Sequence, residues 1–475
     1  MPQPDCRQFI AGEWVEGRGR RHPILDKYTL EPFASVAEAS AGQLREAVDA
    51  AQAAFARGAP AGHDRGAILD RAAEAVGARQ EEFVRAMQRE AGFTRSDAMG
   101  EVRRTINTLR LSAEEARRLT GDVIPVEGVQ GQSGRIAFTL RVPLGVVLAV
   151  TPFNSPLNTV THKLGPALAA GNAVVLKPSL HTPITACLLA EVLADAGVPR
   201  GFLSVLHGAG ETVRLLQEDQ RIRFFAFTGS TEVGRVIQQQ AGLRRTQMEL
   251  GSIAFTILCD DANLEAALPK VVSAAYRKAG QVCTSIQLLL VHETIVPQVE
   301  ERLTAQVQAL SCGNPADDGT VVGPVISEDA ARRIEAWIDE AVAGGARKLA
   351  GGPRRGPVVA PTLLSGIRDD MRVGCSEIFG PVMSIVPFRT LDEAIARVNA
   401  TPYGLATGIF TNRLGDALRA ARTLQVGGVH VNETSSSRVD VMPYGGSKDS
   451  GFGREGPHYA VHEMTEERVV SMTAA

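Results

Sequence analysis

Long apolar runs, an excess of charge of one sign and paired cysteines are all missing from this 475-residue sequence. No apolar stretch approaches the roughly 18 residues that a membrane-spanning helix needs. The first residues show no basic segment followed by an apolar one, so we expect no signal peptide and a cytoplasmic location. The net charge of −3 comes without a basic stripe or a block of like charges, which argues against nucleic-acid and membrane partners.

The cysteines are few and widely spaced. None forms a Cys-x-x-Cys pair and there is no His-Glu-x-x-His motif, so we expect neither a disulfide framework nor a metal site. Most free cysteines are small buried hydrophobes, so a catalytic role needs support from neighbouring residues. Aromatic residues make up only 5% of the chain, which disfavours a pocket walled by aromatic side chains. The six cysteines are Cys6, Cys187, Cys259, Cys283, Cys312 and Cys375.

Apolar periodicity divides the chain into a helical start and two α/β series. A chain of this length exceeds what one hydrophobic core usually fills, so two or three domains are expected. Helices are predicted over 42–58, 65–91 and about 96–119. Buried strands over 145–150, 173–176, 202–206 and 224–227 then alternate with helices over 182–197, 210–218 and 231–241. This alternation predicts a parallel sheet built from βαβ units.

A second α/β series follows Gly251. Its strands are predicted over 255–258 and 287–291, and its helices over 263–280, 293–310, 328–343, 391–399 and 414–424. The change of series near Gly251 would place Glu249 and Cys283 at a domain interface, where ligand sites are common. The last strand, over 468–472, is too short to fold alone, and we expect it to pair with another subunit.

Glu249 and Cys283 carry the chemistry that the sequence indicates most strongly. Glu249 follows strand residues that are predicted to be buried, and buried acids are rare unless they are paired or used. Cys283 stands in a loop between a predicted helix and a predicted strand, where a thiol is more accessible than within an element. A carboxylate base and a thiol nucleophile together can oxidise an aldehyde through a thioester that water then cleaves.

Loops that follow the predicted strands could meet a ligand, because parallel sheets bind ligands at the carboxyl ends of their strands. Asn154 could donate to an oxyanion, although a plain turn explains its segment as well. Lys177 could bind ribose or phosphate, or be an ordinary surface lysine. In 227–234, Thr231 is the expected helix N-cap, and the helix start could bind pyrophosphate. Gly208–Val213 lacks the third glycine of Gly-x-Gly-x-x-Gly, so spacing alone supports a nucleotide only weakly.

Eight short segments occur in a characteristic order: Pro143–Val147, Thr151–Pro156, Pro166–Asn172, Phe227–Ser230, Glu249–Gly251, Gly280–Cys283, Glu377–Val382 and Pro443–Gly451. Together they resemble the motifs of the aldehyde dehydrogenase superfamily, and the resemblance covers almost the whole chain. It implies an α/β fold with a Rossmann-like cofactor domain, an α/β catalytic domain and a β-arm for oligomerisation. It also implies NAD or NADP as cofactor, a small aldehyde as substrate, and a homodimer or homotetramer.

The same resemblance implies domain boundaries. The cofactor domain would comprise 1–121 and 143–250, and the catalytic domain 251–430. The arm would combine 122–142 with 464–475, and 431–463 would return to the cofactor domain.

The resemblance also assigns roles to individual residues. Cys283 would be the nucleophile and Glu249 the general base for deacylation. Asn154 and the Cys283 backbone N–H would hold the oxyanion, with Lys163 and Glu455 supporting Glu249 and its water. The implied cofactor contacts are Thr151, Pro152, Phe153, Lys177, Ser179, Leu180, Gly210, Phe227, Thr228, Gly229, Ser230, Leu250, Gly251, Glu377 and Phe379.

Within the cofactor set, Lys177 and Glu377 would contact ribose, Ser230 the pyrophosphate and Phe379 the nicotinamide. Leu180 stands where NAD-selective relatives often carry a glutamate. That glutamate would repel the 2′-phosphate of NADP, so its absence leads us to expect that NADP is tolerated, with NAD the default by family frequency. Two other departures, at Ser252-Ile253 and Leu288, have no expected effect on the chemistry.

Two arginines bear on the substrate. Arg104 and Arg438 resemble residues that hold the anionic group in relatives acting on semialdehydes, phosphoaldehydes or phosphonoaldehydes, and a guanidinium suits such groups. We therefore expect a small anionic aldehyde, with ordinary surface arginines as the plainer explanation. Val282 stands where the phosphate- and phosphonate-handling relatives can carry an arginine. The expected substrate contacts are Arg104, Ser155, Asn158, His162, Val282, Thr284 and Arg438.

Other functions remain as alternatives. A small neutral or hydroxy-aldehyde, such as lactaldehyde or glycolaldehyde, could be the substrate, as could an aromatic aldehyde. A coenzyme-A-acylating dehydrogenase is less expected, because such relatives generally lack the base that Glu249 provides. A non-catalytic binding protein is less expected as well, because Cys283 and Asn154 are both present.

Overall fold

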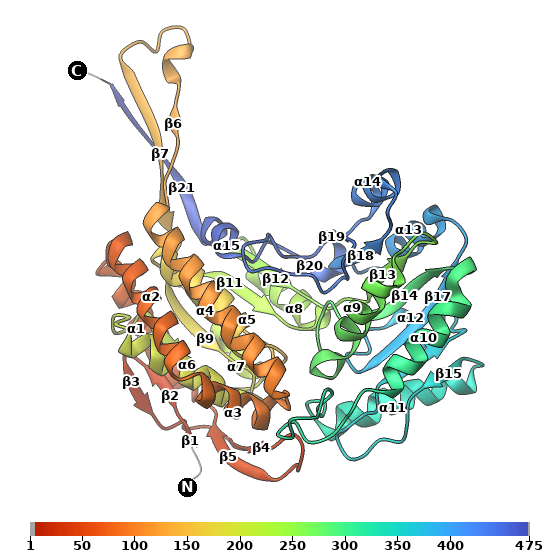
Figure 1. Cartoon of the computed structure of the whole chain (residues 1–475). Helices are drawn as coiled ribbons and strands as arrows, with labels where there is room; N and C mark the ends of the chain where they lie inside the picture. Colours follow the sequence, from red (N-terminus) through yellow and green to blue (C-terminus); the bar gives the residue numbers. More distant parts are fainter. Residues whose placement is uncertain (1–4, 474–475) are drawn as a thin grey trace.

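The computed structural model describes residues 5–473 of the chain. Two α/β lobes lie side by side, and a narrow β-arm extends from the lobe that contains the first half of the sequence (Figure 1). One lobe is built on an eight-stranded sheet and the other on a seven-stranded sheet. The α/β class that the sequence predicts is confirmed. None of the helices within 5–473 is long and apolar enough to cross a membrane.

The eight-stranded sheet belongs to the first lobe. Its strands are β2 Gln8–Ile10, β3 Glu13–Val15, β8 Val146–Val150, β9 Ala173–Lys177, β10 Leu203–Val205, β11 Ile222–Thr228, β12 Arg245–Glu249 and β20 Gly451–Phe452. They follow the order β20-β12-β11-β8-β9-β10-β2-β3. The five central strands are parallel, whereas β20 and the β2–β3 pair join antiparallel. The carboxyl ends of β8, β9, β11 and β12 therefore share one edge.

Helices cover both faces of this sheet. They are α1 Ala41–Ala56, α2 Gly62–Ala78, α3 Gln80–Ala91, α4 Arg95–Arg118, α5 Asn158–Ala170, α6 Pro183–Asp195, α7 Gly210–Glu218, α8 Thr231–Ala241 and α15 Pro457–Glu463. The start of α1 shows why these segments become helical: Ser40 and Gln43 form a reciprocal capping box. Every residue of β8 is buried, as expected for a strand covered on both sides.

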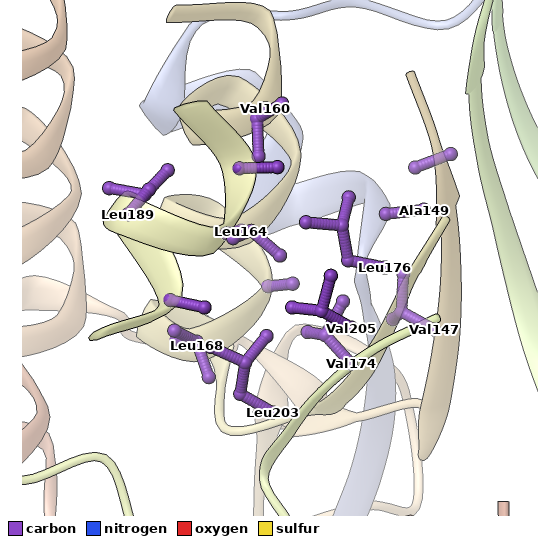
Figure 2. Packing of buried hydrophobic residues seen from close by; sticks show 14 of the residues in the cluster. Val147, Ala149, Val160, Leu164, Leu168, Val174, Leu176, Leu189, Leu203 and Val205 are labelled. Carbon is purple, nitrogen blue, oxygen red and sulfur yellow. The ribbon is translucent and has the colours of Figure 1, made fainter. Parts of the chain in front are cut away.

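Packing between the sheet and α5 makes the strand ends rigid. Figure 2 shows Leu164 of α5 facing Leu176 of the sheet and Leu168 of α5 beside Leu203, and Leu189 of α6 belongs to the same buried cluster. All five side chains are buried. Burying a leucine stabilises the fold by about 1.5–3 kcal/mol relative to leaving it exposed. The loops that leave this sheet edge thus start from fixed positions.

The seven-stranded sheet builds the second lobe. Its strands are β13 Ala254–Leu258, β14 Ile286–His292, β15 Arg347–Ala350, β16 Thr362–Ser365, β17 Val382–Phe388, β18 Ala406–Phe410 and β19 Gly428–Val431. Their order is β15-β16-β17-β14-β13-β18-β19, and only β15 joins antiparallel. The helices are α9 Leu264–Tyr276, α10 Val296–Gln308, α11 Glu328–Ala343, α12 Arg372–Cys375, α13 Leu391–Ala400 and α14 Leu414–Thr423.

Two three-stranded sheets complete the chain. The first comprises β1 Asp5–Cys6, β4 Arg21–Leu25 and β5 Pro32–Ala37. The second forms the arm and comprises β6 Val123–Ile124, β7 Arg135–Pro143 and β21 Thr465–Thr473. Strand β21 pairs with β7 over its whole length. The last strand, which we expected to pair with another subunit, therefore finds a partner in its own chain.

Two predicted helices are divided in the structure. The helix expected over 65–91 is α2 and α3, separated at Arg79, where the backbone leaves the helical region (φ −100°, ψ 17°). The helix expected over 263–280 ends at Tyr276, because Lys278 and Ala279 adopt positive φ values. The N-terminal strands β1 to β5 were not predicted, since each is short and their apolar alternation is weak.

Candidate active site

A cavity of about 440 Å³ opens between the two sheets. Segments after β8, β11 and β12 form one wall, and segments before β14 and β17 form another. Predicted site residues that line it are Arg104, Pro152, Phe153, Asn154, Ser155, Asn158, Thr228, Gly229, Ser230, Glu249, Leu250, Gly251, Val282, Cys283, Thr284, Glu377, Phe379, Arg438 and Glu455. The predicted residues outside this lining are Thr151, His162, Lys163, Lys177, Ser179, Leu180, Gly210 and Phe227.

A sharp backbone turn carries Cys283 to the cavity wall. Lys278 and Ala279 have φ values of 51° and 53°, and Gly280 continues this left-handed run with φ 68°. A side chain on Gly280 would meet the carbonyl oxygen of Gly380 at 2.1 Å, so only glycine permits this close approach. Each non-glycine residue held in the left-handed region costs roughly 1–2 kcal/mol. The turn therefore persists only because other contacts hold it.

Buried polar contacts hold the turn. The Lys278 ammonium pairs with Glu101 at 2.7 Å and also donates to the Asn154 carbonyl at 3.2 Å. Gln281 accepts the Ile326 backbone N–H at 2.9 Å. The Asn154 side-chain amide donates to the Gln281 carbonyl at 2.9 Å. Because one amide hydrogen of Asn154 is used in this way, the amide is fixed in orientation and its second hydrogen remains for a ligand oxygen.

The Cys283 thiol is half-buried, and its sulfur lies 2.9 Å from the Tyr444 hydroxyl. Burial raises the pKa of this thiol to about 11, the Tyr444 contact lowers it, and the carboxyl groups of Glu249 and Glu377 raise it further. Cys283 is therefore protonated at neutral pH in the ligand-free protein. Thiolate chemistry at this position needs a group that removes the proton or stabilises the charge.

Glu249 ends strand β12 and faces the same cavity. The residue is buried, and neither carboxyl oxygen has a hydrogen-bond partner within residues 5–473. Burial raises the pKa of Glu249 well above its ordinary value, and the nearby Glu455 carboxylate raises it further. A buried carboxyl without a partner is costly unless a ligand or a water meets it. This geometry suits a proton acceptor for a water or a thiol in the cavity.

Lys163 and Glu455 contact each other and do not touch the Glu249 carboxyl. Lys163 Nζ lies 2.8 Å from Glu455 Oε1 and donates to Gln247 Oε1 at 2.8 Å. Arg438 donates to the other Glu455 oxygen at 2.7 Å. Burial raises the pKa of Glu455, but Lys163 and Arg438 outweigh it and hold that pKa well below its ordinary value. Support for Glu249 from this pair is therefore electrostatic.

The start of α8 faces the cavity at its other end. Gly229 and Ser230 line the wall, and the Ser230 hydroxyl accepts the Val233 N–H at 3.4 Å. Ser230 is thus the N-cap. The prediction of Thr231 was wrong, since its hydroxyl donates to the Asp449 carbonyl at 3.0 Å instead. The free N–H groups at such a helix start suit a pyrophosphate.

Glu377 stands beside the helix start. Its carboxylate accepts the Ser252 backbone N–H at 2.9 Å, and burial raises its pKa to about 7. A side chain on Gly251 would meet Glu377 Oε2 at 2.7 Å, so this glycine leaves room for the carboxylate. Phe379 packs edge-on against Phe153, with ring centroids 5.9 Å apart. A carboxylate, two ring edges and a glycine-lined helix start fit the ribose, nicotinamide and pyrophosphate of a dinucleotide.

Lys177 ends β9 at the same sheet edge, outside the cavity lining. Burial lowers its pKa to about 8, and Glu38 raises it. Its ammonium has no hydrogen-bond partner among the described residues, which leaves it available to a ribose hydroxyl or a phosphate. Gly210, by contrast, is the exposed first residue of α7, and nothing lies within 4 Å of the place a side chain would take.

Charged residues gather at the remaining side of the cavity. Arg104 pairs with buried Asp440 at 2.7 Å, and His162 Nε2 lies 3.0 Å from the same carboxylate. Asn158 donates to it at 3.3 Å. Arg438 Nη2 lies 3.1 Å from His162 Nε2, so this imidazole links the two arginines through Asp440. His162 is therefore a buried connector behind the wall, and the predicted substrate contact is indirect.

Arg277 is a wall residue that sequence reasoning missed. It lies six residues before Cys283 and directly before Lys278. Burial lowers the pKa of its guanidinium, yet no hydrogen bond or ion pair to that group is formed within residues 5–473. Lys278 next to it is fully paired with Glu101. The carboxylates of Asp97 and Glu101 act on this guanidinium only through their charge, so its N–H groups remain free to donate to an anion in the cavity.

Other wall residues also lacked an assigned role. They are Thr159, Lys278, Arg333, Ser436 and Tyr444. Tyr444 lies inside a segment that carries the family resemblance, so its position could have been suspected. Ser436 stands two residues before Arg438, a predicted substrate contact, so it too could have been suspected. Arg333 stands far from every predicted motif, and only the packing of the second lobe brings it to the cavity.

Comparison with known proteins is consistent with this geometry. Residues 14–470 match the aldehyde dehydrogenase family. Two 3-sulfolactaldehyde dehydrogenases, from Priestia aryabhattai and Priestia megaterium, are each 45% identical over 463 residues, which covers 97% of this chain and 97% of each relative. The structure of aldehyde dehydrogenase 21 from Physcomitrella patens, in complex with the reaction product succinate, is 37% identical with a TM-score of 0.96 and covers 100% of this chain and 99% of that chain.

A second solved structure bears on the cofactor. The NADP-dependent glyceraldehyde-3-phosphate dehydrogenase from Bacillus halodurans, complexed with NADP, is 35% identical with a TM-score of 0.96, and each chain is covered over 100% of its length. The chain therefore belongs to the aldehyde dehydrogenase family. It is an oxidoreductase that oxidises aldehydes with NAD or NADP. The family, the enzyme class and the cofactor class that the sequence predicts are confirmed.

Proposed function

We propose that this enzyme oxidises a short aldehyde that carries an anionic group, such as 3-sulfolactaldehyde or a semialdehyde, to the carboxylic acid. The relatives named for 3-sulfolactaldehyde and the solved structure with succinate support this class. Both compounds carry an anionic group on a short chain. The proposal needs a positive region in the cavity close to Cys283.

Arg277 is the observation that carries the proposal. Its guanidinium lines the same cavity as Cys283 and makes no hydrogen bond or ion pair among residues 5–473, although the Asp97 and Glu101 carboxylates are near enough to raise its pKa. A buried charge is normally paired, because desolvation is costly without compensation. A sulfonate or carboxylate of the substrate would supply that compensation through charge-assisted hydrogen bonds.

Arg104 and Arg438 add further donors. Arg104 Nη1 makes no hydrogen bond within the described residues, and Arg438 Nε is buried without a partner. Each arginine is held in place by a carboxylate, Asp440 for Arg104 and Glu455 for Arg438. A guanidinium has five N–H donors, so it can keep such a pair and still bind a substrate anion.

The chain's residues divide the chemistry between them. The Cys283 thiolate attacks the aldehyde carbon, and the oxygen becomes an oxyanion that the Asn154 amide and the Cys283 backbone N–H stabilise; one such donor is worth roughly 3–4 kcal/mol in known systems. Bound NAD or NADP supplies a hydride acceptor, and Pro152, Phe153 and Phe379 line that side of the cavity. Glu249 then removes a proton from the water that cleaves the Cys283 thioester.

A matched pair of aldehydes tests the proposal. Lactaldehyde and 3-sulfolactaldehyde differ only in the sulfonate, so their kcat/KM ratio isolates the contribution of the charge. With each cofactor in turn, we expect 3-sulfolactaldehyde to be preferred by at least about tenfold, the equivalent of one charge-assisted hydrogen bond. Equal kcat/KM values, or a preference for lactaldehyde, would contradict the anionic proposal.

A hydroxy-aldehyde without charge is the second candidate. Hydroxyl groups of Ser155, Thr159, Thr284 and Ser436 line the cavity and could bind a neutral polar substrate. Because Ser155 already donates to Glu101, and Thr284 contacts Ser436 at 3.1 Å, fewer of these groups are free. The same matched pair of aldehydes distinguishes the two candidates.

The predicted domain partition and self-association are part of the proposal. Two lobes on separate sheets support a cofactor domain of 1–121 and 143–250 and a catalytic domain of 251–430. The arm exposes apolar side chains at Val123, Ile136, Leu140, Val469 and Met472. Exposed apolar patches commonly mark interaction sites, so we infer that the arm contacts a second copy of the chain. Sedimentation of the purified enzyme tests for a dimer or tetramer.

A further inference from the structure

Tyr444 contacts the reacting sulfur directly. Its hydroxyl oxygen lies 2.9 Å from Cys283 Sγ. Tyr444 belongs to the segment between β19 and β20, whereas Cys283 stands before β14, so two distant parts of the chain meet at this contact. The separation is 161 residues, which shows that the pair is a product of the fold and not of local sequence.

Arg438 lies against the face of the Tyr444 ring. The guanidinium carbon is 3.8 Å from the ring centroid. The same guanidinium donates to the Glu455 carboxylate at 2.7 Å. A cation on the ring face fixes the ring and favours donation of a hydrogen bond by the phenol. The hydroxyl is thus directed at sulfur by a rigid arrangement.

Cys283 and Glu249 cannot easily both be negative. Both groups face the same cavity, and each carboxylate near the thiol disfavours its ionisation. The titratable and charged groups that face Cys283 are Glu249, Glu377, Arg277, Arg438 and Tyr444. One proton is shared between the thiol and the carboxyl, and the group without it is negative. A hydrogen-bond donor to the sulfur therefore favours the state in which Cys283 is the thiolate and Glu249 holds the proton.

We propose that the Tyr444 hydroxyl is a catalytic hydrogen-bond donor to the Cys283 sulfur. Cys283 and Glu249 share one negative charge, and this hydrogen bond keeps that charge on sulfur when the carbon–sulfur bond forms and again when it breaks. The inference rests on the proposed role of Cys283 as nucleophile. It does not depend on which aldehyde is bound.

The donor acts at two steps without losing its own proton. Before attack, the thiol proton moves to Glu249, and the O–H of Tyr444 stabilises the remaining thiolate. The sulfur electron pair then forms the bond to the aldehyde carbon, and sulfur becomes neutral. The hydride on that carbon would pass to the bound NAD or NADP, which leaves a thioester, and Glu249 releases the thiol proton to solvent. During hydrolysis, the ionised Glu249 takes a proton from water, the new carbon–oxygen bond forms, and the carbon–sulfur bond breaks with its electron pair returning to sulfur. Tyr444 stabilises that leaving thiolate as well.

Alkylation of Cys283 by iodoacetamide tests the proposal without substrate or cofactor. The reagent is neutral, so the surrounding arginines do not attract it. Rates are measured on the full-length enzyme from pH 6 to pH 10 by mass spectrometry of the Cys283 peptide, with exposed Cys375 as an internal reference. In Tyr444→Phe we expect Cys283 to react about tenfold more slowly at pH 8, since a hydrogen bond to a charged group is lost. Because the thiol pKa is raised to about 11, the rate should rise with pH throughout this range in both proteins, and the curve for Tyr444→Phe should be displaced to higher pH.

A matched variant separates this effect from a general disturbance. Tyr276→Phe removes another buried hydroxyl, which donates to the Thr362 carbonyl at 3.0 Å in the lobe that carries Cys283. Its Cys283 profile should equal that of wild type, and thermal unfolding checks that each variant is folded. In turnover, Tyr444→Phe should lower kcat and leave the KM for aldehyde little changed.

Two results would overturn the proposal. One is an unchanged Cys283 alkylation rate from pH 6 to pH 10 in Tyr444→Phe, and the other is the same loss of rate in Tyr276→Phe. Failure of the proposed nucleophile role of Cys283 looks different. Turnover would then survive in Cys283→Ala, while the slower alkylation in Tyr444→Phe would still be observed.

Discussion

The cofactor end and the substrate end of the cavity are lined by different kinds of residue. At the cofactor end, the wall combines backbone and small residues such as Gly229 and Gly251 with the Glu377 carboxylate, the rings of Phe153 and Phe379, and Arg333. At the substrate end, the wall consists of charged side chains whose partners come from remote segments, such as Arg104 and Asp440, 336 residues apart. A common cofactor can be met by a short motif, whereas recognition of a particular substrate depends on charges that only folding brings together.

The ends also differ in electrostatics. Near Glu377 the cavity carries a weakly acidic group, with a pKa raised to about 7 by burial. Near Arg277 it carries a guanidinium with no partner within the described part of the chain. Cys283 is near enough to feel the charges of both Glu377 and Arg277. We expect changes at either end to separate into effects on cofactor and effects on aldehyde.

Removal of the nucleophile is the most severe test of that separation. In Cys283→Ala we expect turnover to fall by at least about 10⁴-fold, as for other nucleophile deletions. Cofactor binding, followed by fluorescence titration, should be retained, because the helix start of α8 and Glu377 are untouched. Loss of cofactor binding in this variant would show that the two ends are not independent.

The general base gives the next largest effect. In Glu249→Gln we expect a first burst of NAD(P)H of the same size but formed more slowly, because Glu249 also accepts the thiol proton. Later turnover should fall by roughly 10²–10³-fold, because general bases contribute about this much. Rapid-mixing absorbance measures both phases. Burial raises the pKa of Glu249, and only the deprotonated form accepts a proton, so wild-type hydrolysis should rise with pH where that carboxyl titrates. A variant that retains this rise would assign it to another group.

Charge at the substrate end is tested by Arg277→Met. We expect kcat/KM for 3-sulfolactaldehyde to fall about 10- to 100-fold, because a charge-assisted hydrogen bond contributes about 1.5–3 kcal/mol. Lactaldehyde should be affected much less. Arg103→Met, at an exposed position of α4, is the matched control and should behave as wild type. An equal fall in kcat/KM for both aldehydes would mean that Arg277 contributes to the shape of the cavity but does not distinguish a charged substrate from a neutral one.

The smallest effect is expected at the cofactor end. In Gly251→Ala the new methyl group would stand 2.7 Å from Glu377 Oε2 and must displace the carboxylate. We expect the cofactor KM to rise about fivefold, or about 1 kcal/mol, with no change in the aldehyde KM. Gly210→Ala, where no atom lies within 4 Å, is the control. If Gly210→Ala raised the cofactor KM and Gly251→Ala did not, the result would contradict our assignment of the cofactor to the wall around Gly251.

Much of the fold was predictable from local pattern. Strands β8, β9 and β11 and helix α8 follow from apolar runs and turn signals that lie within each segment. Helix ends were harder: the predicted helix over 263–280 stops at Tyr276, because the left-handed turn before Cys283 is held by contacts with Glu101 and Ile326. Contacts between residues this far apart in the chain cannot be predicted from a short stretch of sequence.

The candidate site divides in the same way. Cys283, Glu249 and Asn154 were recognisable because their chemistry and their positions beside predicted strands agree, and the structure brings all three to one cavity. Tyr444 and Arg277 were not assigned roles. A tyrosine and an arginine are common residue types, and nothing local distinguishes those that face a cavity from those on a surface.

The sequence by itself determined the alternation of strands and helices, the family motifs and the candidates for a nucleophile and a base. Tertiary structure alone decided which carboxylate holds which arginine, why Lys163 pairs with Glu455, and that a tyrosine hydroxyl reaches sulfur. The physical reason is range. Backbone preference and apolar periodicity act over a few residues, whereas ion pairs and hydrogen bonds between distant segments exist only after two lobes have packed around a shared cavity.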